Sequence, residues 1–495
     1  MSKTQRVIEE SSDSVSQPET MQSETAVPER TSPAATLSLP QVVATPLNQI
    51  QVRMRSITVS ILATFLIRIA SNATAFMVGI YLRSKEVNAP LWTVGIVISC
   101  FYITELLLAP IMGALSDKRG RKLFMLLGPA IGIVAVQIHP LTTMVVIIMV
   151  GRLVEGLAAA TAIPSTLGYL SDVTEGNPVR RGRIMTFFEV ATVVGIALGQ
   201  AAGGPLWDTF GPNGFRFLSL IYIVVMVITY FLMEDSSQVG TRSQSEHSSF
   251  SQYWTLLTNK YVISFIPAWI ALNAIAGSWL DFVPSLLKSE ADTVLKYPGQ
   301  LLVAGYKGSQ ASMILLVYGI AFAVGMGLWS LVFGRLRKTT IMLIALGGLT
   351  VATVCLFIVN GLDTKDWQGT AVSALPKNAQ DLHLVTMPLP LVITIIIILL
   401  IGIMLESGFT PAALAHLADI SSLFPEKRGV LMGLYSVLLG VGQLAGGWLG
   451  GPFVEIWGFN GIIYLTGILL VISFYTVILV RKHGGDQIGV GGSQH

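Results

Sequence analysis

The chain has 495 residues, of which 52% are hydrophobic and only 12% are charged. A soluble protein of this length carries about a quarter charged residues, so this composition and a mean hydropathy of +0.68 exclude an ordinary soluble enzyme and indicate a polytopic membrane protein. The net charge of +3 comes from short clusters of bases between apolar runs, which excludes a nucleic-acid-binding protein because such a protein needs one basic domain.

Residues 1–52 are predicted to be a disordered cytoplasmic tail. They are rich in Ser, Thr, Glu, Gln and Pro, and a segment of that composition cannot bury enough apolar surface to order itself. No apolar stretch of the kind found in a cleavable signal peptide occurs in this region. We therefore expect the chain to enter the membrane at its first apolar run, which follows Arg53 and Arg55.

The apolar runs after this tail predict twelve membrane-spanning helices, because each run is long enough to cross a hydrocarbon core of roughly 30 Å. The predicted spans are residues 57–82, 91–115, 122–139, 142–169, 183–207, 216–233, 261–287, 311–334, 339–359, 388–417, 429–453 and 460–480. Lys and Arg are concentrated in the loops that this model places on the side of both termini. By the positive-inside rule both termini are cytoplasmic, and we expect a plasma (inner) membrane.

A polar, Ser-rich segment, residues 234–260, is predicted to be a cytoplasmic linker. It separates an N-terminal six-helix half, residues 53–233, from a C-terminal six-helix half, residues 261–482. Residues 483–495 are predicted to be a second cytoplasmic tail. The expected fold class is therefore an all-α polytopic membrane protein with 12 transmembrane helices in two halves.

An internal repeat relates the two halves. With a shift of 247 residues, the segment 203–214 aligns with 450–461, and six of the twelve positions are identical. The same shift aligns Asp172 with Asp419 and keeps one register over about 50 residues. Because six spans separate the aligned segments, the two halves have the same orientation in the membrane. Such a parallel repeat is typical of secondary transporters.

The loop between the second and third spans combines small residues, an acid and a cluster of bases. Its key residues are Gly113, Asp117, Gly120, Arg121 and Lys122. Bases alone would indicate only a cytoplasmic loop, whereas the full order predicts a cytoplasmic gate. We expect Asp117 to approach the positive N-terminus of the eleventh span, near Arg428, when the cytoplasmic side closes. Asp172 and Asp419, which end the fourth and tenth spans before basic clusters, are predicted to be equivalent gate charges.

This loop and two further motifs resemble the major facilitator superfamily of transporters. The five loop residues occupy the positions of that family's signature between spans 2 and 3. The run Gly151 to Gly156 in the fourth span resembles the family's second motif, and the run Gly195 to Gly204 resembles the motif of proton-driven efflux members. Gln200 departs from that motif, which has proline there. The resemblance implies a transporter fold, similar to 12-span drug/proton antiporters, over about residues 55–482.

Ionisable side chains inside the hydrocarbon are costly and mark candidate substrate and proton sites. The predicted pathway residues are Arg68, Asn72, Glu105, Arg152, Glu155 and Glu406. A carboxylate that moves between an arginine and apolar surroundings changes its proton affinity, which would couple proton movement to substrate movement. The structural alternative is that Arg152–Glu155 or Arg68–Glu105 is a static pair between or along helices. Asp281 lies nearer the membrane surface and is predicted to be structural.

Glycines recur at every fourth position in the fifth and eleventh spans. They are Gly195, Gly199, Gly203, Gly442, Gly446 and Gly450. Glycines at positions i and i+4 open a groove in which a second helix can pack closely. If these two helices line the seam between the halves, such grooves would let the halves rock.

Together these features predict a secondary active transporter that moves a small organic solute by alternating access, as proton-coupled efflux. One alternative is an uptake symporter of an organic anion or nutrient, in which Arg68 would bind the anion. Another is a transporter-like receptor or scaffold that moves no substrate. An enzyme is not expected, because no nucleophile–base pair, metal-ligand spacing or nucleotide-binding motif occurs. The expected partners are the lipid bilayer, a small-molecule substrate and protons, with no nucleic acid, metal or cofactor, and we expect a monomer.

Overall fold

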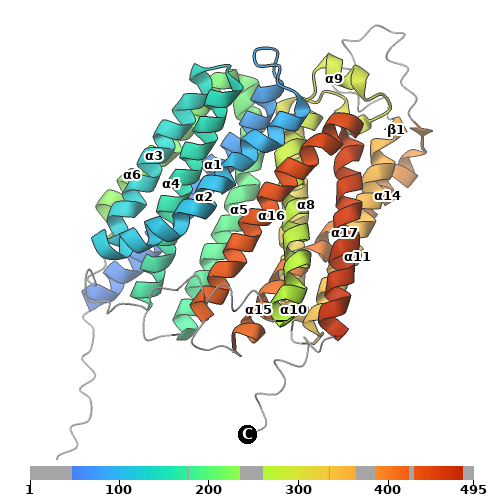
Figure 1. Cartoon of the computed structure of the whole chain (residues 1–495). Helices are drawn as coiled ribbons and strands as arrows, with labels where there is room; N and C mark the ends of the chain where they lie inside the picture. Colours follow the sequence, from blue (N-terminus) through green and yellow to red (C-terminus); the bar gives the residue numbers. More distant parts are fainter. Residues whose placement is uncertain are drawn as a thin grey trace, which may run out of the picture. The chain divides into compact units, whose positions relative to one another are not determined.

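A computed structural model of the protein describes residues 47–174, 178–234, 260–333, 335–363, 385–422 and 428–482, and nearly all of them are helical. The longer helices are α1 (Leu47–Arg83), α2 (Leu91–Arg119), α3 (Arg121–Ile138), α4 (Val145–Val173), α5 (Pro178–Phe210), α6 (Gly214–Leu232), α8 (Lys260–Leu287), α10 (Gly308–Val332), α11 (Lys338–Asn360), α14 (Leu389–Glu406), α15 (Phe409–Ser422), α16 (Arg428–Trp457) and α17 (Phe459–Lys482) (Figure 1). Short elements are α9 (Ala291–Lys296), the 3-10 helices η1 (His139–Leu141), η2 (Gly211–Asn213) and η3 (Leu301–Val303), and two parallel two-residue strands, β1 (Leu362–Asp363) and β2 (Val385–Thr386).

Within the described ranges, eleven helical segments are long and apolar enough to cross a membrane. One of them, Arg180–Leu232, contains both α5 and α6, which the short helix η2 separates. Gly211 begins η2 with a φ of +53°, a conformation that side chains other than glycine disfavour, so the chain turns there. Counting α5 and α6 separately gives twelve spans, in agreement with the sequence.

The predicted tenth span, residues 388–417, is not one continuous helix: α14 ends at Glu406 and α15 begins at Phe409. The Trp329 side chain of α10 packs against Gly408 between them, where any side chain would overlap the indole. Its Nε1–H donates to the carbonyl oxygens of Met404, at 3.2 Å, and Leu405, at 3.1 Å. These bonds give a further donor to two carbonyls in the last turn of α14, where the helical hydrogen-bond pattern ends, so Trp329 stabilises the break.

Some predicted segments differ from the structure or lie beyond it. Helix α1 begins at Leu47, inside the segment that was predicted to be a tail. The rest of that tail, nearly all of the predicted linker and the second predicted tail lie outside the described residues, at 1–46, 235–259 and 483–495.

The helices pack in two groups, and their contacts repeat. Helices α1–α6, which we call the first half, pack mainly on one another, and so do helices α8–α17, which we call the second half. In the first half α5 packs along α1, and in the second half α16 packs along α8. Gly195 of α5 contacts Cβ of Arg68, and its repeat counterpart Gly442 contacts Cβ of Asn273. The sequence repeat therefore corresponds to a repeat of helix packing.

The two halves meet where α2 packs on α16 and where α5 packs on α10, a boundary that we call the seam. Backbones come very close there, because Gly95 faces the carbonyl of Gly447 and Gly204 faces the carbonyl of Gly308. These contacts lie toward the end of the bundle that carries α9, which we call the α9 end (Figure 1). We call the opposite end, where α2 joins α3, the basic end.

Helix α2 shows where along the seam the packing is tight. Its buried residues run from Leu91 to Phe101 toward the α9 end, and no other residue of α2 is buried until Ser116. Leu107, halfway to the basic end, is 64% exposed. Helix α2 is therefore packed most tightly toward the α9 end, where the seam is closed.

The repeated glycine packing predicts that one added methyl group will destabilise the fold at Gly446. A methyl at that position would overlap the carbonyl oxygen of Ala274 on α8, whereas a methyl at Gly467 of α17 would meet no atom within 4 Å. We expect Gly446→Ala to cost about 1–3 kcal/mol of stability through overpacking and to lower the thermal unfolding midpoint of the purified protein. Gly467→Ala is the matched control, and equal midpoints for the two variants would contradict close packing at Gly446.

Candidate functional site

Arg152 and Glu155 form a buried ion pair on α4. Three positions apart, they lie on one face of the helix, and their exposed fractions are 2% and 1%. Arg152 also donates to the carbonyl oxygen of Ile98 at 3.3 Å, and its guanidinium carbon lies 5.1 Å from the centre of the Phe101 ring. The pair therefore ties α4 to α2 in the arrangement seen here, and its role in proton transfer stays a prediction.

A small cavity lies beside Glu155, inside the first half. It is lined by Ile67 and Ser71 of α1, Gly128 and Pro129 of α3, and Tyr222 of α6, among others. The second carboxylate oxygen of Glu155 has no hydrogen-bond partner among the described residues. Glu155 thus faces space within its own half rather than the seam.

Arg68 of α1 and Glu105 of α2 are partly exposed, unlike the buried Arg152–Glu155 pair. Arg68 makes no ion pair within 4 Å with any residue that the structure describes, so the predicted Arg68–Glu105 alternative is not a direct pair here. The Asn72 side chain donates to the Arg68 carbonyl at 2.9 Å. Glu105 nevertheless lies within electrostatic range of both Arg68 and Arg152.

Glu406 lies apart from these residues, at the break between α14 and α15. The Tyr318 hydroxyl of α10 donates to a Glu406 carboxylate oxygen at a long 3.5 Å. The structure therefore brings the predicted pathway residues together on α1, α2 and α4, with Glu406 in the second half beside Tyr318.

Asp281 of α8 is the residue whose surroundings the sequence did not reveal. It is 1% exposed, and its Oδ2 has no hydrogen-bond partner among the described residues. Asp281 lies at the seam. A Cβ atom at Gly447 of α16 would lie 2.6 Å from Asp281 Oδ2 and 2.9 Å from Cβ of Ser99 on α2, so the two side chains meet against this glycine. The available signal was that Asp281 is the one acid in an otherwise apolar span, residues 261–287.

Tyr102 of α2 links Asp281 to the charges of the first half. Its side chain lies within electrostatic range of Asp281, Glu105, Arg152 and Arg68. One acid of the second half and three ionisable groups of the first half therefore surround a single stretch of α2. This cluster is the candidate functional site of the described residues.

The predicted gate residues at the basic end pair within their own halves. Arg121 is buried, pairs with Asp117 and with Asp172, whose Oδ2 is 3.4 Å from its Nε, and occupies space left by Gly168. In the second half Lys338 pairs with Asp419. The repeat therefore positions an equivalent cation–acid pair in each half.

Two other gate residues have simple structural explanations. Gly120 joins α2 to α3 with a φ of 101°, a conformation that favours glycine, and Lys122 donates to the Met233 carbonyl at 2.6 Å. The Arg428 side chain lies outside the described residues, so its approach to Asp117 stays a prediction.

Comparison with known proteins gives a consistent family. The family model "Major Facilitator Superfamily" matches residues 60–376. Multidrug resistance protein 2 of Bacillus subtilis (strain 168) is 25% identical over 370 residues, which cover 74% of this chain and 80% of that protein. Tetracycline resistance protein, class H, of Pasteurella multocida is 27% identical over 147 residues, 29% of this chain and 35% of that protein.

Solved structures show the same fold. The crystal structure of the nucleoside transporter NupG superposes with a TM-score of 0.63 at 15% identity, and the match covers 87% of this chain and 98% of NupG. At that level of identity the likeness concerns the fold alone.

The buried ion pair predicts unequal costs for single and double substitutions. Arg152→Met leaves the Glu155 charge buried without a partner, which costs about 3–5 kcal/mol, so we expect a marked fall in the thermal unfolding midpoint. Glu155→Gln with Arg152→Met removes both charges and should recover part of that loss. A double variant no more stable than Arg152→Met would show that the pair does not stabilise the folded protein.

Proposed function

The chain belongs to the Major Facilitator Superfamily, and from this premise we propose that it exports small organic solutes in exchange for protons by alternating access. The family model covers most of the membrane region. Several relatives are named for drug resistance, and one of them, multidrug resistance protein 2, is matched over 80% of its length. The Gly-rich α5 supports the same direction, although Gln200 replaces a proline of the efflux motif.

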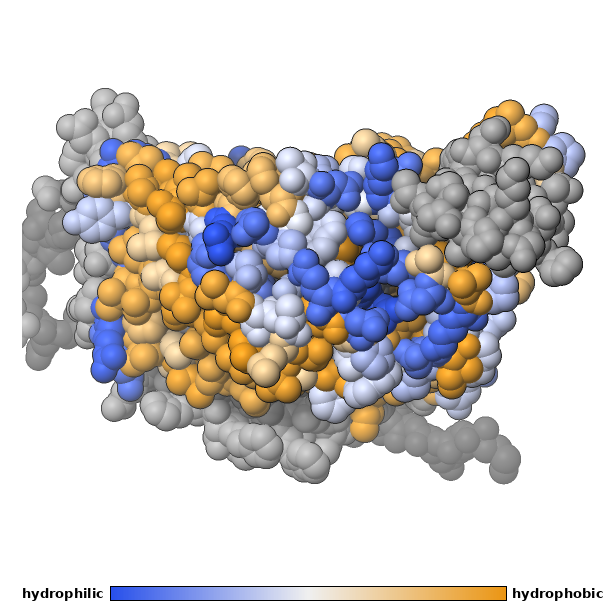
Figure 2. All heavy atoms as spheres, turned by 90° about the horizontal axis from the view of Figure 1, so that it is seen from above, coloured by the Kyte–Doolittle hydropathy of each residue, from blue (hydrophilic) through white to orange (hydrophobic). Residues whose placement is uncertain are grey.

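We assign the α9 end to the outer side of a plasma (inner) membrane and the basic end, with both termini, to the cytoplasm. The loops at the basic end carry the excess of Lys and Arg, which favours the cytoplasmic side. Figure 2, a view onto the α9 end, shows hydrophilic residues gathered over the middle and the second half, where an aqueous face is expected. The closed seam at this end then corresponds to a state that opens toward the cytoplasm.

The burial of Asp281 at the seam is the observation that best supports proton coupling. The Oδ2 atom of Asp281 is buried without a hydrogen-bond partner among the described residues and lies between α2 and α16, the two helices that must separate when the outer side opens. An isolated acid in hydrocarbon is a functional candidate by default, and a change from apolar surroundings to water changes its proton affinity. Asp281 would bind or release its proton as the seam opens and closes.

Substrate binding is assigned to the partly exposed side chains next to this acid. Arg68 has no ion-pair partner among the described residues, and Glu105 lies within range of it. A substrate that contacts Arg68 would change the field at Glu105, and through Tyr102 at Asp281. Because the Arg68 guanidinium makes no ion pair with any described residue, we propose neutral or anionic amphipathic solutes as the substrate class.

The proton assignment predicts the loss of coupling in Asp281→Asn. Asn cannot take up a proton, so substrate-driven proton movement in proteoliposomes containing a trapped pH dye should fall at least about tenfold. Glu105→Gln should show a smaller loss, and Glu155→Gln tests whether the buried pair also carries protons. The matched control is Glu86→Gln, an exposed acid in the loop between α1 and α2.

Unchanged proton movement in both Asp281→Asn and Glu105→Gln would overturn this proton pathway. The screen uses panels of anionic, neutral and cationic amphipaths, applied to either side of the membrane. If no solute moves protons in the parent protein, the proposed coupling itself is wrong.

Arg68 decides between the proposed export and the alternative, uptake of an organic anion with protons. We expect Arg68→Gln to weaken binding of anionic solutes about tenfold or more, since a charge-assisted bond is lost, while neutral solutes bind within about twofold of the parent. Binding is measured by tryptophan quenching of the purified protein. Accumulation of an anion inside vesicles along the proton gradient would favour the symporter.

A further inference from the structure

Asp208, at the end of α5, caps the N-terminus of a helix in the opposite half. Its Oδ1 accepts the N–H of Gly308 at 2.9 Å, and its Oδ2 accepts the N–H of Ser309 at 2.7 Å. These are the first two residues of α10. The first N–H groups of a helix have no intrahelical partner and carry the positive end of the helix dipole, so an external carboxylate is a favourable partner there.

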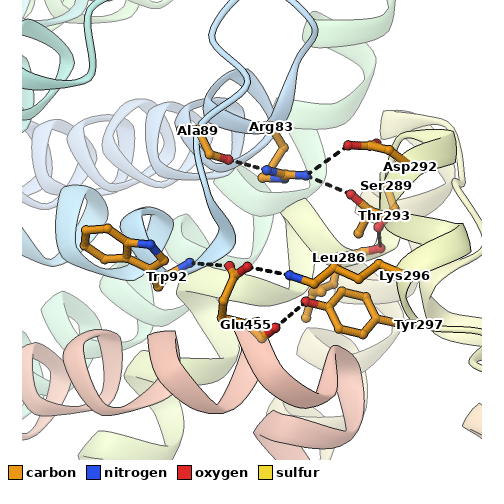
Figure 3. Close-up of polar contacts among 10 residues, drawn as sticks. All are labelled: Arg83, Ala89, Trp92, Leu286, Ser289, Asp292, Thr293, Lys296, Tyr297 and Glu455. Carbon is orange, nitrogen blue, oxygen red and sulfur yellow. Dashed lines mark hydrogen bonds and ion pairs between the residues drawn. The ribbon is translucent and has the colours of Figure 1, made fainter.

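Glu455, near the end of α16 in the second half, caps the N-terminus of a helix in the first half. Its Oε2 accepts the N–H of Trp92 at 3.3 Å, in the first turn of α2 (Figure 3). Its Oε1 accepts a bond from Lys296 of α9 at 2.5 Å, and its backbone carbonyl accepts the Tyr297 hydroxyl at 2.7 Å. Glu455 therefore connects α16 to the first half and to the α9 segment together.

The two acids are equivalent in the internal repeat. A shift of 247 residues places Asp208 on Glu455. Each acid follows a glycine that lies against the first turn of the capped helix: Gly204 against the Gly308 carbonyl, and Gly451 against the Trp92 carbonyl. The same device thus occurs twice, once from each half.

We propose that Asp208 and Glu455 form a symmetric pair of latches that hold the outer end of the transporter closed. Each latch is a carboxylate of one half on the free helix N-terminus of the other half, so both must break when α2 separates from α16 and α5 separates from α10. The proposal rests on the alternating access proposed above, but on neither the direction of transport nor the coupling ion.

The α9 segment reinforces one latch. Arg83, at the end of α1, donates to the Thr293 hydroxyl at 2.7 Å and lies 4.0 Å from Asp292, so it joins the first half to α9 (Figure 3). The hydrogen bond from Lys296 to the Glu455 carboxylate raises the pKa of Lys296, so this cation stays charged at neutral pH. Lys296 is half exposed, so salt screens its attraction for Glu455. This ion pair therefore stabilises the latch less than the bond from Glu455 to the helix N-terminus does.

The test measures access from the outer side to a reporter beneath the latches. Ser99 is fully buried at the seam beside Gly447, and Ser99→Cys is made in a background in which the buried Cys100 and Cys355 are replaced by Ser. Intact cells are treated with a membrane-impermeant maleimide, and the rate of labelling is followed without substrate.

The variants separate the loss of a cap from the loss of a charge. Ala cannot cap a helix, whereas Asn keeps one acceptor oxygen for the two N–H groups that Asp208 binds, so we expect Asp208→Ala to raise the labelling rate about fivefold and Asp208→Asn to raise it less. Glu455→Ala should give a similar rise, and the two together about 25-fold. Glu455→Gln, which keeps an acceptor and loses its attraction for Lys296, should resemble Lys296→Met, with a rise of about twofold or less.

Three outcomes decide the proposal. A rise for both Ala variants, with Glu86→Gln as a neutral control, supports two latches. No rise for either variant, or a rise for one only, overturns the symmetric pair. Because labelling needs no proton gradient and no substrate, it fails or succeeds independently of the loss of proton movement in Asp281→Asn.

Discussion

The close approach of helix backbones at glycine is the contact on which the rest of this structure depends. Hydrocarbon provides no hydrophobic driving force between helices, so packing and hydrogen bonds decide which helices meet. Gly95 against Gly447 and Gly204 against Gly308 let the two halves touch backbone to backbone at the α9 end. That contact encloses Asp281, and it brings the acids at the ends of α5 and α16 to helix N-termini of the opposite half.

Charges within this bundle fall into two kinds, which burial and partners distinguish. Arg152 and Glu155 are both buried and paired, so moving either away from the other is costly. Asp281 is equally buried, but neither Asp281 nor Arg68 makes an ion pair with any residue that the structure describes. A paired charge stabilises one arrangement, whereas an unpaired one can respond to a proton, a substrate or a change in packing.

The two halves share a packing plan and differ in the side chains that would bind and move solutes. The Cβ atoms of Arg68 and Asn273 contact equivalent glycines, so the repeat places a cation in one half and an amide in the other. Equivalent acid–base pairs occur at the basic end, Arg121 with Asp172 and Lys338 with Asp419. The glycines and gate pairs come from a common architecture, and the central charges are where the halves diverge.

The sequence by itself determined the family and an all-α fold of about twelve membrane-spanning helices, and both are confirmed, because hydrophobic length and sequence motifs are properties of the chain read in order. The sequence did not predict the break in the tenth span, because the indole that stabilises the break comes from α10. It also did not predict the burial of Asp281 or the hydrogen-bond partners of Asp208 and Glu455. Which face of a helix meets which neighbour depends on packing between segments far apart in the chain, and only the tertiary structure decides that.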